Sequence, residues 1–480
     1  MEDDDRKSST KNKPQKFWEW AIASMILRLI LIYFSKNLNF SSRPEVSTPL
    51  TSLRRLAEGY WLKQSSLSPY AGSMYHGSPL LLAVIGPLTA IRISGQPSHL
   101  LCSFLFVIAD FITAMLIRAM GQKLQSAYSQ HLKSLGLDKV LKAPEMLSSG
   151  DVAALVYLWN PLTIVTCMGS STSPIENFFV TLSLYGACAR LVPLASFGLV
   201  MATHLSLYPA ILFIPVILLL GYGIDTPPRK LFLQKDSGNE MKLSSDISSQ
   251  HIGMTNHLAL PSFSWRLPMY FLLWASIWSC YILALCAVSV YKNGGLKEMF
   301  KRTYGFILTV EDLSPNIGVL WYFFAEVFDF FRDFFLIVFH MNILFMILPL
   351  AIRLKHRPCF LAFVYTAISS LLKSYPSVAD SALYLGLLGL FANELSDMHL
   401  SFFLFCGYVG VNLLSPIMHN LWIWRGTGNA NFYYATAMAY ACFQIILVVE
   451  SVSAMLKNDR MLRRLSTIKD SCIEKTTKIS

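Results

Sequence analysis

The run FFLIVFHMNILFMILPLAI, residues Phe334–Ile352, contains no Asp, Glu, Lys or Arg and presents apolar side chains on every side of a helix. About 20 residues of helix are needed to cross a hydrocarbon core of roughly 30 Å. The strands of a membrane β-barrel instead alternate apolar and polar residues over segments of about ten. Because this run does not alternate, it predicts a transmembrane α-helix.

Apolar runs at or near this length recur from Phe17 to Leu456. Of the 480 residues, 54% are hydrophobic and only 14% are charged, whereas a soluble domain carries about a quarter charged residues. These proportions exclude a soluble globular enzyme. We predict an all-α polytopic membrane protein with about twelve transmembrane helices, at 17–35, 98–120, 151–169, 174–190, 191–206, 207–223, 267–291, 332–352, 358–374, 378–394, 399–421 and 432–456.

The distribution of Lys and Arg predicts the orientation of these helices. An even number of crossings places both ends of the chain on one side, and cytoplasmic segments carry the excess of basic residues. With the N-terminus inside, the cytoplasmic segments hold roughly twice as many Lys and Arg as the luminal ones. They are the tails 1–16 and 457–480, the loop 119–150, the polar insert 225–264 and the turn 353–357. We therefore expect a multispanning domain at 17–456 with both termini cytoplasmic.

The segment Pro79–Ile93 is apolar but short, and it is interrupted by Pro87. Counting it as a full crossing would place the basic turn 353–357 and the basic C-terminal tail outside. We expect it instead to enter the membrane from one side or to pack within the bundle. It then belongs to the first of two long luminal loops, 35–97 and 292–331. The first of these is basic, which weakens the charge rule locally or reflects an anionic partner.

Ionisable residues inside membrane helices need a partner, a wet cavity or a function. We expect Lys373 to pair with Asp380 and, as a looser expectation, Arg28 to pair with Asp110. Breaks at Asn160-Pro161, Tyr208-Pro209 and Tyr375-Pro376 free backbone carbonyls, which is tolerable at membrane depth only against protein or a wet cavity. Several of the breaks fall towards the lumen, so the sequence predicts a luminal cavity.

The last luminal turn, 424–432, combines glycines with Arg425, Asn429 and Asn431. Glycine lets the backbone approach a ligand closely, and asparagine amides both donate and accept hydrogen bonds. Such groups suit phosphate oxygens, sugar hydroxyls or ethanolamine. The alternative is that the Asn/Gly-rich segment is only a turn.

Several short motifs resemble, in order along the chain, those of the phosphatidylinositol glycan anchor biosynthesis class U family. They are SPYAG at 68–72 with His76, LYP at 207–209, YGFIL at 304–308, DLSPNIG at 312–318, WYFFAE at 321–326, KSYP at 373–376 and NANF at 429–432. The resemblance implies a subunit of the glycosylphosphatidylinositol (GPI) transamidase of the endoplasmic reticulum (ER) membrane. That complex removes a C-terminal signal and joins the new carboxyl end to the ethanolamine of a lipid anchor.

In that family the Cys/His catalytic pair lies on another, cysteine-protease-like subunit. The resemblance therefore implies as partners the other transamidase subunits, the GPI lipid and the ER phospholipids, and no nucleic acid. It also implies a helical bundle similar to that of the GT-C glycosyltransferases, which use lipid-phosphate sugars. The family is thought to recognise either the anchor lipid or the attachment signal, and the sequence leaves both open.

The residues can also be tested directly for catalytic groups. A GT-C mannosyltransferase places closely spaced acidic residues on its first luminal loop as a general base. Here that loop offers only Glu45 and Glu58, thirteen positions apart, and no Asp. No cysteine lies in either long luminal loop, and no Cys or His spacing suits a metal. We expect no catalytic residue, metal or cofactor; the alternatives are a mannosyltransferase, a transporter or a membrane scaffold.

The predicted GPI-binding cavity is bounded by 68–79, 304–326 and 429–432. Asn429 and Asn431 are the first candidates for contact, followed by Asp312, Asn316 and Tyr322, with a helix cap ahead of Pro315 as the alternative role of Asp312. At the opposite face, Arg353 and Lys355 are candidates for binding anionic lipid headgroups. Their alternative role is to set the orientation of the chain.

Overall fold

The computed structural model describes residues 2–34, 40–72, 74–90, 92–93, 96–97, 100–134, 148–225, 263–291 and 294–477. Most of the predicted insert 225–264 therefore lies outside the described residues. The helices are α1 (Glu2–Phe34), α2 (Leu53–Gln64), α3 (Pro79–Thr89), α4 (Leu100–Ser134), α5 (Ser149–Trp159), α6 (Pro161–Met168), α7 (Ser173–Cys188), α8 (Val192–Ser206), α9 (Phe213–Tyr222), α10 (Arg266–Val290), α11 (Gly295–Phe300), α12 (Phe306–Thr309), α13 (Leu320–Glu326), α14 (Asp329–Arg353), α15 (Pro358–Leu372), α16 (Val378–Leu388), α17 (Ser401–Ile423) and α18 (Ala430–Thr477).

Shorter elements connect these helices. There are 3₁₀ turns at Phe40–Ser42, Tyr208–Leu212 and Gly389–Phe391, and a π-helical turn at Lys301–Gly305. Strands β1 (Arg92–Ile93) and β2 (Gln96–Pro97) pair antiparallel in a two-residue ladder. The fold is otherwise built of helices, so the all-α class is confirmed.

Six of the described helices are long and apolar enough to cross a membrane, and the bent pair α5–α6 adds a seventh if it is one span. All twelve predicted spans coincide with a helix or with helical pieces joined end to end. Several of these, including α15 with 15 residues and α16 with 11, are shorter than the usual crossing length. The polytopic membrane character is thus confirmed, while the number twelve stays a prediction. Helix α3, with 11 residues, falls short of a span, as expected.

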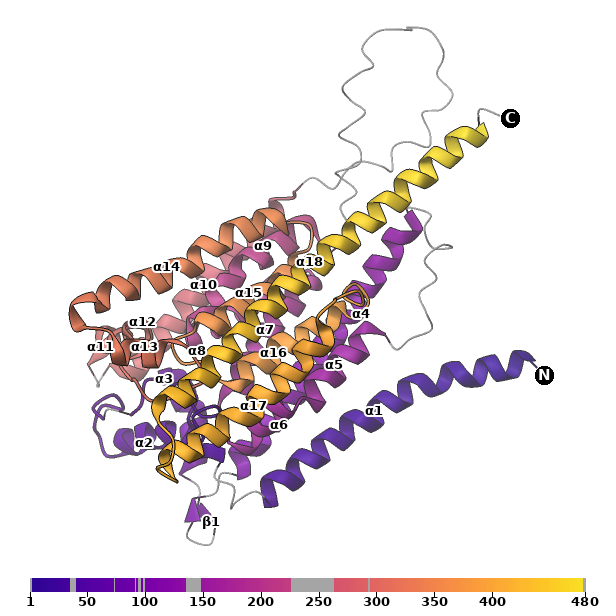
Figure 1. Cartoon of the computed structure of the whole chain (residues 1–480). Coiled ribbons are helices and arrows are strands. Elements are labelled where there is room, and N and C mark those ends of the chain that lie inside the picture. The colour runs from indigo at the N-terminus through magenta and orange to yellow at the C-terminus, as the bar shows by residue number, and fades with distance from the viewer. Residues whose placement is uncertain are drawn as a thin grey trace.

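The bundle has two distinct ends (Figure 1). Helices α1 and α18 both project from one of them, which we call the terminal end. The short helices α2, α11, α12 and α13 gather at the other, which we call the loop end. The predicted C-terminal tail 457–480 is helical as far as Thr477, because α18 continues for 48 residues.

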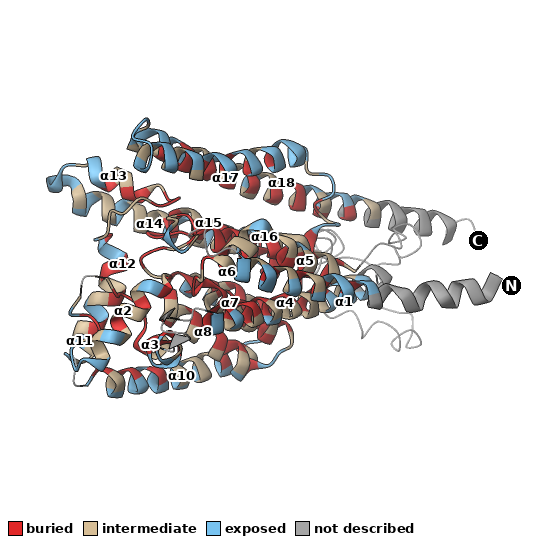
Figure 2. Cartoon of the chain, turned by 90° about the horizontal axis from the view of Figure 1, so that it is seen from below, coloured by how far each residue is buried: buried red, intermediate tan, exposed pale blue. Residues whose placement is uncertain are grey.

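Burial follows the position of each helix in the bundle (Figure 2). Helix α15 is the most enclosed, with 12 buried residues spread over all its sides. Helix α14 contains the apolar run 334–352 but buries only Ile343. Since this run and α15 are both apolar all round, the difference reflects how much of the chain packs around each helix.

The break between α5 and α6 shows how a proline builds local structure. Pro161 has no N–H for the carbonyl of Tyr157, and the N–H of Leu162 donates instead to the Asn160 side chain at 3.0 Å. The helix bends by 44° there, and the carbonyls of Tyr157 and Leu158 lose their helical donors. Thr163 Oγ1 donates to the first at 2.8 Å and Arg28 Nη2 to the second at 2.6 Å.

Arg28 consequently makes its hydrogen bonds without a carboxylate, and its Nε has no partner among the described residues. Its other hydrogen bonds go to Ser24 Oγ at 2.6 Å and Thr163 Oγ1 at 3.0 Å. Asp110 accepts from Tyr157 Oη and Cys167 Sγ, each at 2.8 Å. The expected direct pairing of Arg28 with Asp110 is therefore wrong, because the proline-freed carbonyl is the better placed acceptor.

The expected pairing of Lys373 is confirmed. Its Nζ lies 2.9 Å from Asp380 Oδ1 and also 3.2 Å from Glu176 Oε1 on α7. Asp380 in turn accepts the N–H of Ser377, which closes a capping box at the start of α16. The buried ammonium of Lys373 thus connects α7, the end of α15 and the start of α16 on their loop-end side.

Candidate functional site

The two predicted site residues Tyr322 and Asn431 meet at the loop end. The Tyr322 hydroxyl, on α13, donates to Asn431 Oδ1 in the first turn of α18. The Tyr322 and Tyr434 rings lie 4.7 Å apart, and Tyr434 Oη donates to the carbonyl of Val319 at 3.1 Å. These contacts hold the WYFFAE segment against the start of α18 and the turn that precedes it.

Asn429 has a local role. It is exposed and directly precedes α18, where its Oδ1 accepts the N–H of Phe432 at 3.2 Å. This is the bond of a helix N-cap, which satisfies one of the free N–H groups at a helix start. Its neighbour Asn431 points to α13 instead, so the two asparagines of the NANF motif serve different partners.

Asp312 and Asn316 build the loop between α12 and α13. Asp312 Oδ2 lies 2.8 Å from Arg55 Nη2 on α2, and Oδ1 accepts the N–H of Ser314 at 2.8 Å. Burial alone would raise the pKa of Asp312, but the hydrogen bonds from Ser314 and Arg55 outweigh it and hold the pKa below its usual value. Asp312 thus stabilises a turn and an inter-loop ion pair, and not a helix cap ahead of Pro315.

Asn316 is fully buried. Its Oδ1 accepts the N–H of Gly318 at 2.8 Å and its Nδ2 donates to the carbonyl of Ser314 at 3.2 Å. Both ends of the amide are therefore used within the loop, and ligand contact by Asn316 or Asp312 stays a prediction.

Three of the family-like motifs converge in one stack of rings. His76 lies flat on Phe306, with ring centroids 3.6 Å apart, and Phe306 stacks on Tyr375 at 5.0 Å. Tyr375 Oη accepts the N–H of Asp312 at 3.0 Å. The stack joins the first luminal loop, the YGFIL segment and the KSYP turn, and it leads directly to the DLSPNIG loop.

A cavity of about 330 Å³ lies beside this region, and its main lining was not predicted. The segment 40–46 and helices α6, α16, α17 and α18 form its walls, and Ile317 is its one contribution from the predicted boundary segments. Most of the lining is aliphatic, including Leu162, Val165 and Val411. Arg43 and Glu45 are its charged residues.

Several buried polar atoms that have no hydrogen-bond partner in the described part of the chain lie around Tyr433, next to this cavity. They include Trp321 Nε1, His419 Nδ1 and Arg43 Nη1. The Tyr433 ring lies 6.1 Å from the Trp321 ring and 5.3 Å from the His419 ring, and its hydroxyl adjoins Glu45. Since buried polar groups are normally paired, this group indicates a place for a polar ligand or water.

The signal for this cavity was present in the sequence but incomplete. Both charges lie in the first luminal loop, whose basic character already suggested an anionic partner. Only the fold shows that this short segment reaches α16 and α17, because Val378 N–H donates to the carbonyl of Glu45 at 3.0 Å and Ser415 Oγ donates to its carboxylate at 3.3 Å.

The terminal end holds the predicted headgroup residues. Arg353 and Lys355 are exposed there, as a contact with anionic lipid requires. Arg357 of the same basic turn is buried, with Nη2 at 2.5 Å from Asp459 Oδ1 of α18. Arg357 therefore belongs to the protein interior and is unsuited to bind headgroups.

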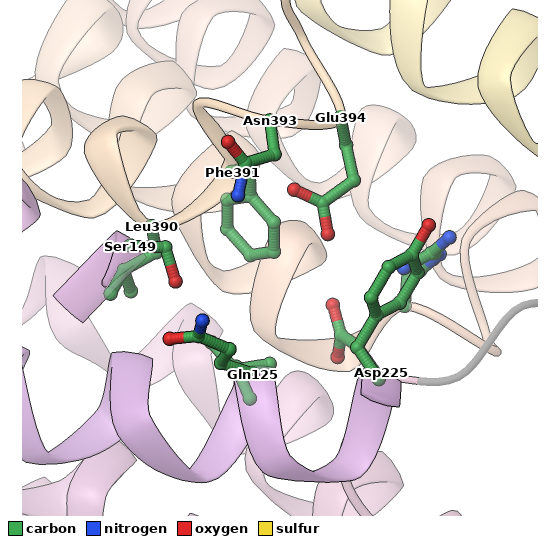
Figure 3. A pocket seen from close by; sticks show the side chains of 10 residues that line it. Gln125, Ser149, Asp225, Leu390, Phe391, Asn393 and Glu394 are labelled. Carbon is green, nitrogen blue, oxygen red and sulfur yellow. The ribbon is translucent and has the colours of Figure 1, made fainter. Parts of the chain in front are cut away.

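A small cavity of about 40 Å³ adjoins Arg357, and Figure 3 shows Asp225 and Glu394 pointing into it from different segments. Asp225 accepts the backbone N–H groups of Cys359 and Phe360 at 2.7 and 3.0 Å, at the start of α15. Burial raises the pKa of the Asp225 carboxyl to about 6, against the opposing effects of Arg357 and these N–H groups. Among the described residues, no group of His, Cys, Asp and Glu side chains is placed to hold a metal ion.

The family follows from comparison of the whole chain. A family model described as GPI transamidase subunit PIG-U matches residues 22–440. The chain belongs to the PIG-U family. The motifs that meet in the ring stack and at the Tyr322–Asn431 contact lie inside the matched range, so the resemblance drawn from them is confirmed.

Relatives from animals and fungi match nearly the full PIG-U chain. The GPI-anchor transamidase component PIGU of Homo sapiens is 31% identical over 457 residues, which are 92% of this chain and 94% of the relative. The PIGU component of Cricetulus griseus is likewise 31% identical, over 453 residues. The GPI transamidase component GAB1 of Saccharomyces cerevisiae is 27% identical over 414 residues, 86% of this chain and 87% of the relative.

Proposed function

We propose that this chain is a non-catalytic subunit of a GPI transamidase and acts in the ER membrane. Its relatives in mammals and yeast are named as components of that complex, and their sequences align with most of this chain. The partners are then the other subunits, including a cysteine-protease-like subunit that carries the catalytic Cys/His pair. The terminal end faces the cytoplasm, and the loop end faces the lumen, where the anchor is attached.

The loop end is the proposed contact with the GPI lipid. The single observation that supports it is the hydrogen bond from Tyr322 to Asn431, which brings two family-like motifs together at an exposed position. A tyrosine hydroxyl and an asparagine amide can exchange hydrogen bonds with phosphate oxygens, sugar hydroxyls or an ethanolamine group. Asn429 holds the turn in shape beside them as the cap of α18.

The contribution of this chain to the reaction is positioning. The attacking amine of the anchor must reach the acyl-enzyme on the catalytic subunit in a suitable orientation. Holding a nucleophile in place can lower a barrier by several kcal/mol without any chemical step on the holding subunit. The His76–Phe306–Tyr375 stack and the Arg55–Asp312 ion pair give the loop end the rigidity that positioning requires.

The proposal is tested by Asn431→Ala in cells that lack their own copy of the subunit. We expect less GPI-anchored reporter at the cell surface, while the other subunits still co-purify with the variant. Thr427→Ala, an exposed position in the same turn, is the matched control and should behave as wild type. Normal reporter levels with Asn431→Ala would reject the contact.

The non-catalytic role needs a separate measurement. The purified chain is supplied with lipid-phosphate-linked labelled mannose and an acceptor glycolipid. We expect no transfer above a mock preparation. Transfer that is lost in Glu45→Gln would replace the proposal with a mannosyltransferase.

A further inference from the structure

The 330 Å³ cavity has the composition of a lipid-binding site. Its volume falls in the range of ligand pockets, roughly 300 to 1,000 Å³. The aliphatic lining cannot satisfy the hydroxyl groups of a glycan, whose burial without hydrogen bonds is costly. It does suit a hydrocarbon chain, which gains by leaving water and loses nothing by lacking hydrogen bonds.

The cavity also has an open side towards the bilayer. Pro161, at the start of α6, and Leu413, on α17, both line it and are both exposed. Figure 2 shows the α17–α18 pair as an outer layer of the bundle. A lipid can therefore enter sideways between α6 and α17 without passing through the protein.

The charged residues of the cavity are arranged for a zwitterion. Arg43 and Glu45 lie two positions apart on one segment and both face the cavity, yet they form no ion pair within the described residues. Arg43 keeps a buried Nη1 without an acceptor. The backbone bond from Val378 to Glu45 holds the segment in place, so the fold fixes the segment that carries the two charges beside the cavity.

Each charge calls for a different ligand group. A guanidinium binds phosphate by charge-assisted hydrogen bonds, and His419 with its unpartnered Nδ1 lies beside Arg43. Glu45 accepts a bond from Ser415 Oγ at 3.3 Å, and the Tyr433 hydroxyl also adjoins its carboxylate. Burial raises the pKa of Glu45, and a cation placed beside it would oppose that shift.

We propose that this cavity binds one molecule of phosphatidylethanolamine as a resident lipid, with an acyl chain between α6 and α17, the phosphate at Arg43 and the ammonium at Glu45. Ethanolamine is favoured over choline because its ammonium has three N–H donors for the carboxylate, whereas the quaternary nitrogen of choline has none. The site is distinct from the Tyr322–Asn431 contact and does not depend on anchor recognition.

The experiment measures lipids that co-purify with the assembled complex. After extraction in mild detergent, bound lipids are quantified by mass spectrometry per mole of this chain. We expect about one phosphatidylethanolamine with wild type and roughly tenfold less with Arg43→Gln or Glu45→Gln, since each removes a charge-assisted bond. Arg54→Gln, which removes an exposed charge from the same loop, should retain the lipid.

Two further arms separate the possible occupants. Delipidated complex is placed in nanodiscs of mixed phosphatidylethanolamine and phosphatidylcholine. The wild type should preferentially bind phosphatidylethanolamine, and Glu45→Gln should bind both lipids equally. Val165→Trp fills the cavity and should abolish retention while both charges remain, whereas Val156→Trp on an exposed face should not. If Val165→Trp fails to assemble, the two charge variants still decide the matter.

The proposal is overturned by equal retention of both lipids by wild type, or by unchanged retention in Arg43→Gln and Glu45→Gln. Recovery of anchor precursors in place of phosphatidylethanolamine would likewise overturn it and assign the cavity to the anchor. None of these outcomes depends on the surface-reporter assay, so failure here is distinct from failure of the proposed function.

Discussion

Asp225 accepts the N–H of Cys359 at 2.7 Å, although 134 residues separate them in the sequence. The carboxylate therefore caps α15 from another segment, at the terminal end of the bundle. The negative charge faces the positive end of the helix dipole, and Arg357 lies nearby, yet burial is the larger influence on its pKa.

The raised pKa predicts a stability that depends on pH. Burial raises the pKa of Asp225 in the folded state to about 6 from an ordinary value of 3.8, so the folded state binds the proton more tightly. The contribution of Asp225 to the free energy of unfolding is fully present below pH 3.8 and is lost as the pH rises through about 6. At 1.36 kcal/mol per pKa unit the loss is about 2 to 3 kcal/mol.

This prediction is checked by thermal unfolding in detergent between pH 4.5 and 7.5, in about half-unit steps. We expect the melting temperature of wild type to fall with rising pH and that of Asp225→Asn to fall less. Glu394 faces the same cavity and its pKa is also raised by burial, so Glu394→Gln is measured in parallel. Parallel pH profiles for wild type and Asp225→Asn would contradict the assignment.

Replacing Lys373 by Met should strongly destabilise the protein. The variant leaves the carboxylates of Glu176 and Asp380 buried together without the ammonium that lies between them. Breaking a buried ion pair costs about 3 to 5 kcal/mol. Lys355→Met, at an exposed position of the basic turn, is the control for loss of a lysine and should leave the melting temperature nearly unchanged.

Tyr322→Phe should weaken anchor attachment without loosening α13. The variant keeps the ring against Tyr434 but removes the hydroxyl that donates to Asn431. A single hydrogen bond of about 1 kcal/mol corresponds to a severalfold loss. In a double-mutant cycle with Asn431→Ala the two losses should not add, because both remove the same bond; additive losses would show that the residues act separately.

Neutralising Arg353 and Lys355 should weaken binding to anionic lipid. We expect about 1 kcal/mol for each charge, measured with vesicles that contain or lack phosphatidylserine. Arg357→Gln should instead lower the melting temperature, because it leaves Asp459 buried and unpaired. Equal vesicle binding by wild type and the double variant would leave orientation as the role of the exposed pair.

The sequence predicted the helices well, because a membrane span is a local property of about 20 residues. It also predicted Lys373 with Asp380, since these residues are seven positions apart. The third member, Glu176, was not assigned to this pair, because its contact depends on how α7 is rotated against α15. Asn429 and Asn431 share a motif, and only the packing of α13 separates their roles.

The lining of the cavity and the hydrogen bonds of Arg28 could not be predicted from the sequence, for a similar reason. The walls of the cavity come from segments between residues 40 and 440, and periodicity says nothing about which faces of distant helices meet. For Arg28, the sequence showed a basic residue and an acidic residue, Asp110, in two different membrane spans, but the acceptor was a backbone carbonyl freed by Pro161. Side-chain patterns do not reveal main-chain acceptors.

The contact between Arg28 and the Leu158 carbonyl bears on how the protein is made. Helix α1 is synthesised before α5 and α6, and its guanidinium lacks the Leu158 carbonyl as an acceptor until residues 130 positions later have been synthesised and bent at Pro161. A bare guanidinium in hydrocarbon is costly. We therefore expect α1 to reach its final packing only after α5 and α6 have entered the bilayer.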